Sequence, residues 1–215
     1  MKKISGLYAV TSERYSANEI LREKVGAVLR GGASVVQYRN KSGDRDRRRS
    51  EAADLAWMCQ NAAVCFIVND DIGLACEVGA DGVHLGKDDP DIDRARALLG
   101  PDKLIGASCY NCIEDGRRAV AEGADYLAFG SFFASSTKPD AVRADPGLLM
   151  RAREEFDVPL VAIGGISTQN AAGLIIAGAD ALAVSSALFE REDVEAVARQ
   201  FVRLINASLN REFAR

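Results

Sequence analysis

The stretch Cys65-Phe66-Ile67-Val68-Asn69-Asp70-Asp71 runs four apolar residues directly into three polar ones. A run this short, rich in β-branched and aromatic side chains, is typical of a buried strand in a parallel sheet. The eight runs of this kind are Leu7–Val10, Ser34–Val36, Cys65–Val68, Val83–Leu85, Leu104–Ala107, Tyr126–Phe129, Leu160–Ile163 and Ala181–Val184. Parallel sheets bind ligands at the carboxyl ends of their strands, so the pattern predicts both an α/β enzyme and the location of its site.

Helical spacing fills the intervals between these runs, because apolar residues recur there on one face. The predicted helices are Asn18–Arg30, Asp46–Asn61, Ile72–Glu77, Asp93–Leu99, Glu114–Glu122, Pro146–Phe156, Gln169–Ala177 and Val194–Ala207. A Gly-Ala pair precedes four of the strands, where glycine would end a helix. We expect one (β/α)8 TIM barrel of class α/β, with a parallel eight-stranded core, as a single domain over residues 1–215. A doubly wound open sheet is the alternative.

The composition bounds the classes of partner. Of the 215 residues, 48% are hydrophobic. The net charge of −4 gives no overall attraction to nucleic acid or an anionic membrane. We find no signal peptide and no apolar run near the ~20 residues that cross a bilayer, so we expect a soluble cytoplasmic protein. The basic run Arg45–Arg49 includes an acid and no aromatic residue, and we interpret it as a solvated helix face. Cys109 and Cys112 lack a second pair and nearby histidines, so we interpret them as free thiols instead of a metal or redox site.

Two carboxylates follow neighbouring predicted strands. Asp70 and Asp89 would meet at the same rim of the barrel, where a pair of carboxylates can hold Mg²⁺ together with water and substrate phosphates. Each could instead cap the helix that follows it. Asp71 and Asp88 are the alternates, because the sequence does not exclude a shift of one position.

Basic side chains are predicted at the same rim. Arg39 and Lys41 alternate outward from a strand end, and Lys138 follows the hydroxyl residues of 135–137. Beside a magnesium site, these cations indicate a polyphosphate ligand, since together they offset the charge of a leaving pyrophosphate.

A second anion site is predicted after the last two strands. Gly164 and Gly165 follow the seventh strand, and Ser185 and Ser186 follow the eighth, where such barrels often hold a phosphate. The single histidine, His84, lies within a strand and is expected to be an inward or satisfied core residue. No base is visible near Ser108 in the sequence, so its hydroxyl is expected to bind a ligand and not to act as a nucleophile.

Taken together, seven short motifs resemble the thiamine phosphate synthase family. They are Gln37–Lys41, Val68–Asp71, His84–Asp89, Gly106–Ser108, Phe129–Pro139, Ile163–Ile166 and Ser185–Ala187, within a resemblance that runs from Gly6 to about Leu188. The resemblance implies a transferase of thiamine biosynthesis that depends on Mg²⁺. Such an enzyme joins 4-amino-2-methyl-5-hydroxymethylpyrimidine diphosphate to 4-methyl-5-(2-phosphooxyethyl)thiazole, or its carboxylated form. The products are thiamine phosphate and pyrophosphate, formed along a dissociative path that needs no protein nucleophile.

The resemblance also implies roles for particular residues. The pyrimidine diphosphate would bind Gln37, Tyr38, Arg39, Asn40, Lys41, Asn69, Ser108 and Lys138. The thiazole phosphate would bind Ser135, Ser136, Thr137, Gly165, Ser185 and Ser186, and the metal would bind Asp70 and Asp89. The residues expected to act in catalysis are Arg39, Lys41, Ser108 and Lys138. The family also suggests a homo-oligomer, although nothing in the sequence identifies an interface.

Two departures from the family pattern bear on affinity. Tyr110 stands where the family often has histidine, and Ala134-Ser135 replaces a Pro-Thr pair. Two other functions stay open. A thiazole tautomerase, which is an isomerase, would need the thiazole phosphate pocket but not the full set of Arg39, Lys41, Asp70, Asp89 and Lys138. A non-catalytic phosphate-binding barrel would bind thiazole phosphate without turnover.

Overall fold

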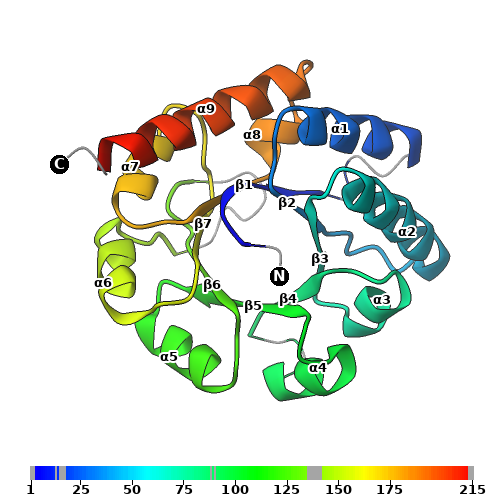
Figure 1. Ribbon diagram of the computed structural model, residues 1–215, viewed down its shortest axis with the longest axis horizontal. Coiled ribbons are helices and arrows are strands. Elements are labelled where there is room, and N and C mark those ends of the chain that lie inside the picture. Colours follow the sequence, from blue (N-terminus) through cyan, green and yellow to red (C-terminus); the bar gives the residue numbers. More distant parts are fainter. Residues whose placement is uncertain are drawn as a thin grey trace.

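The computed structural model describes residues 3–12, 14, 18–87, 89, 91–134 and 142–212, and eight of its strands close into a barrel (Figure 1). All neighbouring strands are parallel and follow chain order, and β8 closes the barrel on β1. The strands are β1 (Gly6–Val10), β2 (Val35–Tyr38), β3 (Cys65–Asn69), β4 (Gly82–Leu85), β5 (Leu104–Tyr110), β6 (Tyr126–Phe129), β7 (Leu160–Ile163) and β8 (Ala181–Val184). The predicted parallel barrel is confirmed, and the open-sheet alternative is wrong.

Helices surround the barrel and separate consecutive strands (Figure 1). They are α1 (Asn18–Arg30), α2 (Arg45–Asn61), α3 (Ile72–Glu77), α4 (Ile92–Leu99), α5 (Ile113–Ala121), α6 (Gly147–Glu155), α7 (Ala171–Ile176), α8 (Ser186–Phe189) and α9 (Val194–Glu212). Sequence periodicity did not predict α8, because four residues make only one turn. β2 and β5 also extend further than predicted, so that some polar residues belong to the strands themselves.

Alternate strand residues divide the core into two layers, as the period of two requires. One set fills the barrel interior, with Tyr8, Val35, Ile67, Tyr126 and Val161 among its members. The other set packs between the strands and the surrounding helices. Side chains near the carboxyl ends of the strands that belong to the first set therefore face into the barrel mouth.

The recurring Gly-Ala-Asp motif joins neighbouring strands. The Asp125 carboxylate accepts a hydrogen bond from the Ile105 backbone N–H at 2.7 Å and pairs with Arg96 at 2.6 Å. Asp81 and Asp180 make the equivalent backbone bond to the strand before them, at 2.8 and 2.7 Å. The motif thus fixes the amino-terminal end of the barrel, opposite the rim where a ligand would bind.

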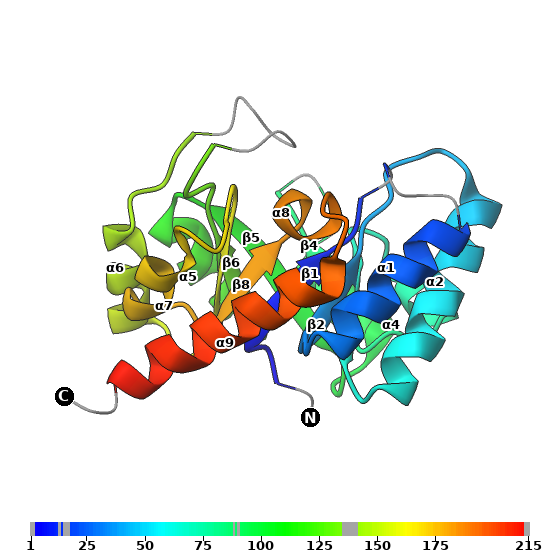
Figure 2. The same cartoon turned by 90° about the horizontal axis from the view of Figure 1, so that it is seen from above.

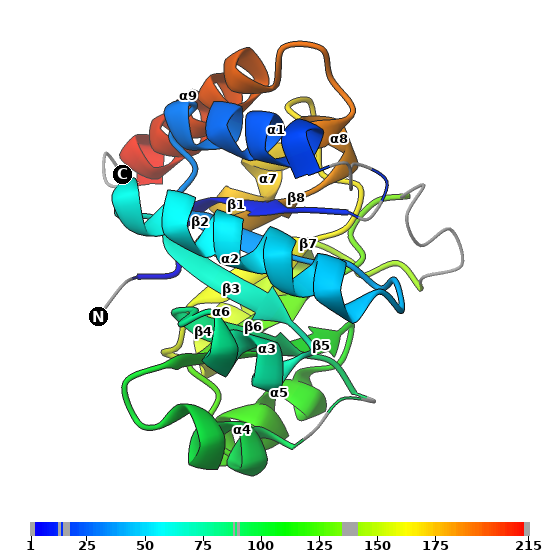
Figure 3. The same ribbon diagram turned by 90° about the vertical axis from the view of Figure 1, so that its right-hand side faces the viewer.

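Figures 2 and 3 show the strands running away from the described start of the chain, so that their carboxyl ends lie together at the opposite side. The C-terminal helix α9 packs across α1 and α7 on the outside of the barrel. The basic run predicted to be a helix face lies in α2, where Arg47, Arg48 and Arg49 pair with acids of this chain. Among the described helices, none has the length and apolar character needed to cross a membrane.

Candidate active site

A cavity of about 810 Å³ opens at the carboxyl ends of the strands. Side chains from β1 through β8 contribute to it, so the barrel brings together residues that are distant in sequence. Seven residues predicted from the sequence line it: Gln37, Arg39, Asn69, Ser108, Gly165, Ser185 and Ser186. Residues from both predicted halves of the site therefore line one cavity, whereas Lys41, Asp70 and Asp89 are not part of its lining.

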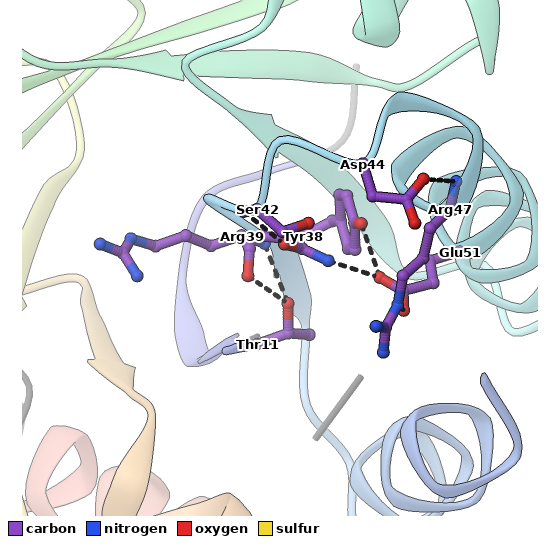
Figure 4. A network of polar contacts seen from close by, with 8 residues as sticks. Thr11, Tyr38, Arg39, Ser42, Asp44, Arg47 and Glu51 are labelled. Carbon is purple, nitrogen blue, oxygen red and sulfur yellow. Dashed lines mark hydrogen bonds and ion pairs between the residues drawn. The ribbon is translucent and has the colours of Figure 1, made fainter. Parts of the chain in front are cut away.

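The predicted residues at the end of β2 divide between two faces of the strand. Gln37 and Arg39 line the cavity, whereas Tyr38 and Asn40 donate hydrogen bonds to Glu51 on α2. Figure 4 shows Tyr38 directed at Glu51 while the Arg39 side chain extends away from it. Successive strand residues point to opposite sides, so a contiguous run cannot present every member to one ligand. Tyr38 and Asn40 thus support this segment from behind, and their role as direct substrate ligands stays a prediction.

Glu51 organises that support. Its side chain is fully buried and accepts hydrogen bonds from Tyr38 Oη at 2.7 Å, Asn40 Nδ2 at 2.9 Å and Arg47 Nε at 2.9 Å. Asn40 Oδ1 in turn accepts from the Ser42 backbone N–H at 2.9 Å, which shapes the loop after β2. A buried carboxylate is stable only when donors compensate for its lost hydration, and this one has three of them.

The backbone of the same segment is tied to β1. Thr11 Oγ1 accepts from the Arg39 backbone N–H at 2.9 Å, and Figure 4 shows this contact beside the Glu51 network. Arg39 is therefore fixed at its backbone while its guanidinium extends toward the cavity.

Asp70 and Asp89 meet at the rim beside the cavity. The Asp70 carboxylate lies 3.1 Å from Lys41 Nζ, and Asp89 accepts from the Gly86 backbone N–H at 2.6 Å. Burial raises the pKa of Asp89, and the hydrogen bond and negative charge of Asp70 raise it further. Asp70 has a φ of 64°, a left-handed conformation that is uncommon for residues other than glycine and that aspartate tolerates. Two acidic groups held this close form a site whose shared charge favours a bound cation.

The helix-capping alternative falls on a different aspartate. Asp71 is the N-cap of α3, accepting from the Leu74 backbone N–H at 2.9 Å, and it pairs with Arg48 at 2.7 Å. Its carboxylate is thus already used in the fold, which favours Asp70 over Asp71 as a metal ligand. Asp88, the other alternate, lies outside the described residues.

The glycines after β7 allow two loops to approach each other. A Cβ on Gly165 would lie 2.3 Å from the Ala134 carbonyl oxygen, and one on Gly164 would collide with Ser131. Gly164 and Gly165 thus admit the loop after β6, and the phosphate expected at this point stays a prediction. Gly165 still lines the cavity, together with Ser185 at the end of β8 and Ser186 at the start of α8.

Four predicted site residues, Ser135, Ser136, Thr137 and Lys138, lie outside the described residues. The described part of their loop enters the cavity wall through Gly130 and Ser131.

Sequence reasoning missed part of the cavity lining. Tyr8, Tyr126 and Lys87 line it, as does His84, which was expected only as an inward or satisfied core residue. His84 is buried and hydrogen-bonded, and its Nε2 lies 2.9 Å from Ser108 Oγ, so an imidazole does stand beside that serine. The period of two along β4 and β5 is the signal that could have brought the two side chains to one face.

Cys109 and Cys112 are free thiols. Burial raises the pKa of the Cys109 thiol to about 12, which keeps it protonated and unreactive at neutral pH. The described residues contain no group of three or more histidine, cysteine or acidic side chains placed to hold a metal ion.

The fold is a (β/α)8 barrel with a cavity at the carboxyl ends of its strands, the arrangement typical of barrel enzymes. Residues 7–188 match the family model described as thiamine monophosphate synthase. The thiamine-phosphate synthase of Thiobacillus denitrificans is 53% identical over 202 residues, which cover 94% of this chain and 95% of that relative. The protein of the same name from Methylobacillus flagellatus is 52% identical, with coverage of 94% and 96%.

A solved structure agrees with these relatives. Thiamine phosphate pyrophosphorylase from Pyrococcus furiosus superposes with a TM-score of 0.87 and 33% sequence identity, over 95% of this chain and 96% of that one. The chain belongs to the thiamine monophosphate synthase family.

Proposed function

We propose that this chain is a magnesium-dependent thiamine-phosphate synthase, a transferase. It joins 4-amino-2-methyl-5-hydroxymethylpyrimidine diphosphate to 4-methyl-5-(2-phosphooxyethyl)thiazole, or to its carboxylated form, and releases pyrophosphate. The observation that carries the proposal is the cluster formed by Lys41, Asp70 and Asp89. The chain neighbours of the two aspartates, Asn69 and Lys87, line the same cavity as Arg39. Relatives of that name, about half identical to this chain over most of its length, support it.

The pyrimidine diphosphate occupies the half of the cavity formed by β2, β3 and β5. Gln37 and Ser108 contact the ring, and Asn69, Arg39 and Lys41 contact the diphosphate; Lys138 is proposed to join them. The buried support beneath β2 keeps the cationic side chains of this segment in place before the substrate arrives, which lowers the cost of ordering them on binding.

The carboxylate pair fits Mg²⁺. Asp70 and Asp89 offer hard oxygen donors at one point, and the raised pKa of Asp89 reflects crowded negative charge that a dication would relieve. When bound, the ion supplies positive charge that stabilises the departing pyrophosphate. Lys41 lies 3.1 Å from Asp70, so the same corner of the site can also hold diphosphate oxygens by direct ion pairing.

The reaction follows from charge stabilisation and positioning. The bond between the substrate methylene carbon and the diphosphate oxygen breaks, and its electron pair leaves with pyrophosphate. The aminopyrimidine ring donates electron density to the methylene cation, and the lone pair of the thiazole nitrogen then forms the new bond to that carbon. Arg39, Lys41 and Lys138 stabilise the leaving negative charge, so no protein nucleophile is needed.

The thiazole phosphate occupies the half of the cavity formed by β7 and β8. Gly165, Ser185 and Ser186 line that half, and residues 135–137 are proposed to complete it. The tautomerase alternative finds no support in the relatives compared, which are named thiamine-phosphate synthase or thiamine phosphate pyrophosphorylase. A tautomerase also has no diphosphate to bind and would not need the contact between Lys41 and Asp70. A cytoplasmic location and a homo-oligomer stay predictions.

Pyrophosphate release tests the proposal. We expect release from purified protein only when both substrates and Mg²⁺ are present, with thiamine phosphate formed in equal amount. A tautomerase would convert its thiazole substrate without releasing pyrophosphate, and a binding protein would retain thiazole phosphate without turnover. No release at saturating substrates and metal would contradict the proposal.

A further inference from the structure

A chain of hydrogen-bonded side chains crosses the floor of the cavity from Gln37 to Ser108. Gln37 Nε2 donates to Tyr8 Oη at 2.8 Å, and Tyr8 Oη lies 3.0 Å from Tyr126 Oη. Tyr126 Oη lies 3.1 Å from His84 Nδ1, and His84 Nε2 lies 2.9 Å from Ser108 Oγ. All five side chains line the cavity, and they come from five different strands.

The middle of the chain is held rigidly. Tyr8 and Tyr126 are almost completely buried, and the rings of His84 and Tyr126 stack with centroids 5.5 Å apart. Gly106 makes room for this arrangement, since a Cβ there would lie 2.0 Å from the Tyr126 ring. Burial raises the pKa of both phenols far above its ordinary value, so each hydroxyl keeps its single proton.

One proton per hydroxyl gives the chain a direction. Tyr8 accepts from Gln37, and among the described residues its other hydroxyl contact is Tyr126, so Tyr8 donates to Tyr126. Tyr126 then donates to His84 Nδ1, which must carry a lone pair. The imidazole proton therefore lies on Nε2 and is donated to Ser108 Oγ.

The direction fixes what the two ends offer to a ligand. Gln37 uses its amide N–H₂ toward Tyr8, which leaves its carbonyl oxygen to accept from the cavity. Ser108 accepts from His84, which leaves its own O–H to donate into the cavity. The reversed chain would be equally complete, but it would require the Gln37 oxygen to face Tyr8 and the histidine proton to lie on Nδ1.

We propose that Tyr8, Tyr126 and His84 are positioning residues that hold Gln37 as an acceptor and Ser108 as a donor, and so select a 4-aminopyrimidine over its 4-oxo analogue. The inference rests on the proposed function, because it assumes that a pyrimidine ring binds this floor. A 4-aminopyrimidine has an exocyclic N–H donor and ring nitrogens that accept. In the 4-oxo analogue the exocyclic group accepts and the neighbouring ring nitrogen donates. Both groups then mismatch the acceptor of Gln37 and the donor of Ser108. A site built around buried polar groups discriminates strongly, because the wrong ligand leaves them unpaired.

The single histidine makes the direction measurable without turnover. In tag-free protein labelled with ¹⁵N-histidine, every imidazole signal arises from His84. We expect the NMR shifts of a neutral ring protonated on Nε2, with Nδ1 accepting a hydrogen bond. A ring protonated on Nδ1 would overturn the inference. This result does not depend on activity, so it stands apart from any failure of the proposed function.

Substrate discrimination tests the consequence. Tyr126→Phe removes the hydroxyl that links Tyr8 to His84. Tyr8 can then donate its proton to the Gln37 oxygen, and the cavity loses the acceptor that Gln37 offered. The ratio of kcat/KM for the 4-amino over the 4-oxo diphosphate should fall by about 10- to 100-fold, while KM for the thiazole phosphate stays unchanged. Ser208→Ala, which removes a buried hydroxyl on α9 outside the cavity, is the control and should keep the wild-type ratio.

The outcomes separate the two proposals. A folded Tyr126→Phe protein that keeps the wild-type ratio overturns the positioning role while the synthase function stands. A wild-type protein that releases no pyrophosphate from either analogue contradicts the proposed function, and the histidine spectrum still decides the direction of the chain. His84→Gln, which can return a donor to Ser108, should retain more activity than His84→Leu; equal loss in both variants would overturn the role assigned to His84.

Discussion

Replacing Glu51 by Gln tests how far the buried support behind β2 contributes to the site. The carboxylate accepts from Tyr38 at 2.7 Å and from Asn40 and Arg47 at 2.9 Å each, with its side chain fully buried. Glutamine has nearly the same shape and can keep its oxygen toward Tyr38 and Asn40. Its amide N–H₂ must then face the Arg47 guanidinium, which offers only donors.

The size of the effect follows from these three bonds. A hydrogen bond to a charged acceptor contributes about 1.5–3 kcal/mol and a neutral one about 0.5–1.5 kcal/mol, so the bonds from Tyr38 and Asn40 each weaken by about 1 kcal/mol. The Arg47 side chain is 39% exposed, and water replaces much of its ion pair, which limits that loss to about 1 kcal/mol. The free energy of unfolding should therefore fall by about 2–3 kcal/mol in Glu51→Gln.

Urea unfolding followed by circular dichroism measures this change, with Arg47→Gln as the control. Arg47→Gln leaves the bonds from Tyr38 and Asn40 in place and should cost at most about 1 kcal/mol. Because Asn40 shapes the loop that carries Lys41, kcat/KM for the pyrimidine diphosphate should also fall roughly 10- to 100-fold in Glu51→Gln. Equal stability and equal kcat/KM in the two variants would refute the reasoning.

Three further predictions concern the metal pair and the barrel floor. Asp70→Ala should lower turnover by about two orders of magnitude or more, with calorimetric binding of thiazole phosphate nearly intact; equal loss in Asp71→Asn would contradict it. Since the pKa of Asp89 is raised and only the deprotonated carboxylate binds metal, Mg²⁺ affinity should fall on acidification, beginning at a higher pH than for an ordinary aspartate. Titration calorimetry between about pH 5 and pH 8 checks this, and a flat profile would count against it. Gly106→Ala should lower the free energy of unfolding by about 1–3 kcal/mol or more in urea, because its Cβ would overlap the Tyr126 ring; wild-type stability would show that the ring can move.

The order of strands and helices could be predicted because each apolar run is short and each is followed by helical spacing. The strand that ends at Asn69 illustrates this, since four apolar residues precede it and a helix follows at Ile72. Helix α8 could not be predicted, because one turn leaves no periodic pattern. The extension of β5 to Tyr110 was missed for a related reason, since its polar residues face the cavity and interrupt the apolar run.

The site was only partly visible for a geometric reason. A contiguous motif at the end of β2 suggested that every residue meets the ligand, whereas alternation turns Tyr38 and Asn40 toward Glu51. Tyr8 and Tyr126 lie within predicted apolar runs of the sequence, and only the closed barrel brings their hydroxyls together. The left-handed backbone at Asp70 was equally hidden, since aspartate is not a residue that requires it.

A crystal structure with Mn²⁺ in place of Mg²⁺ and with pyrophosphate would locate both charges at once, because anomalous scattering identifies the metal. We expect Mn²⁺ between the carboxylates of Asp70 and Asp89, with the pyrophosphate oxygens within ion-pairing distance of Arg39 and Lys41. Mn²⁺ bound away from both carboxylates, or pyrophosphate held solely by Gly165 and Ser185, would contradict the proposed coupling site.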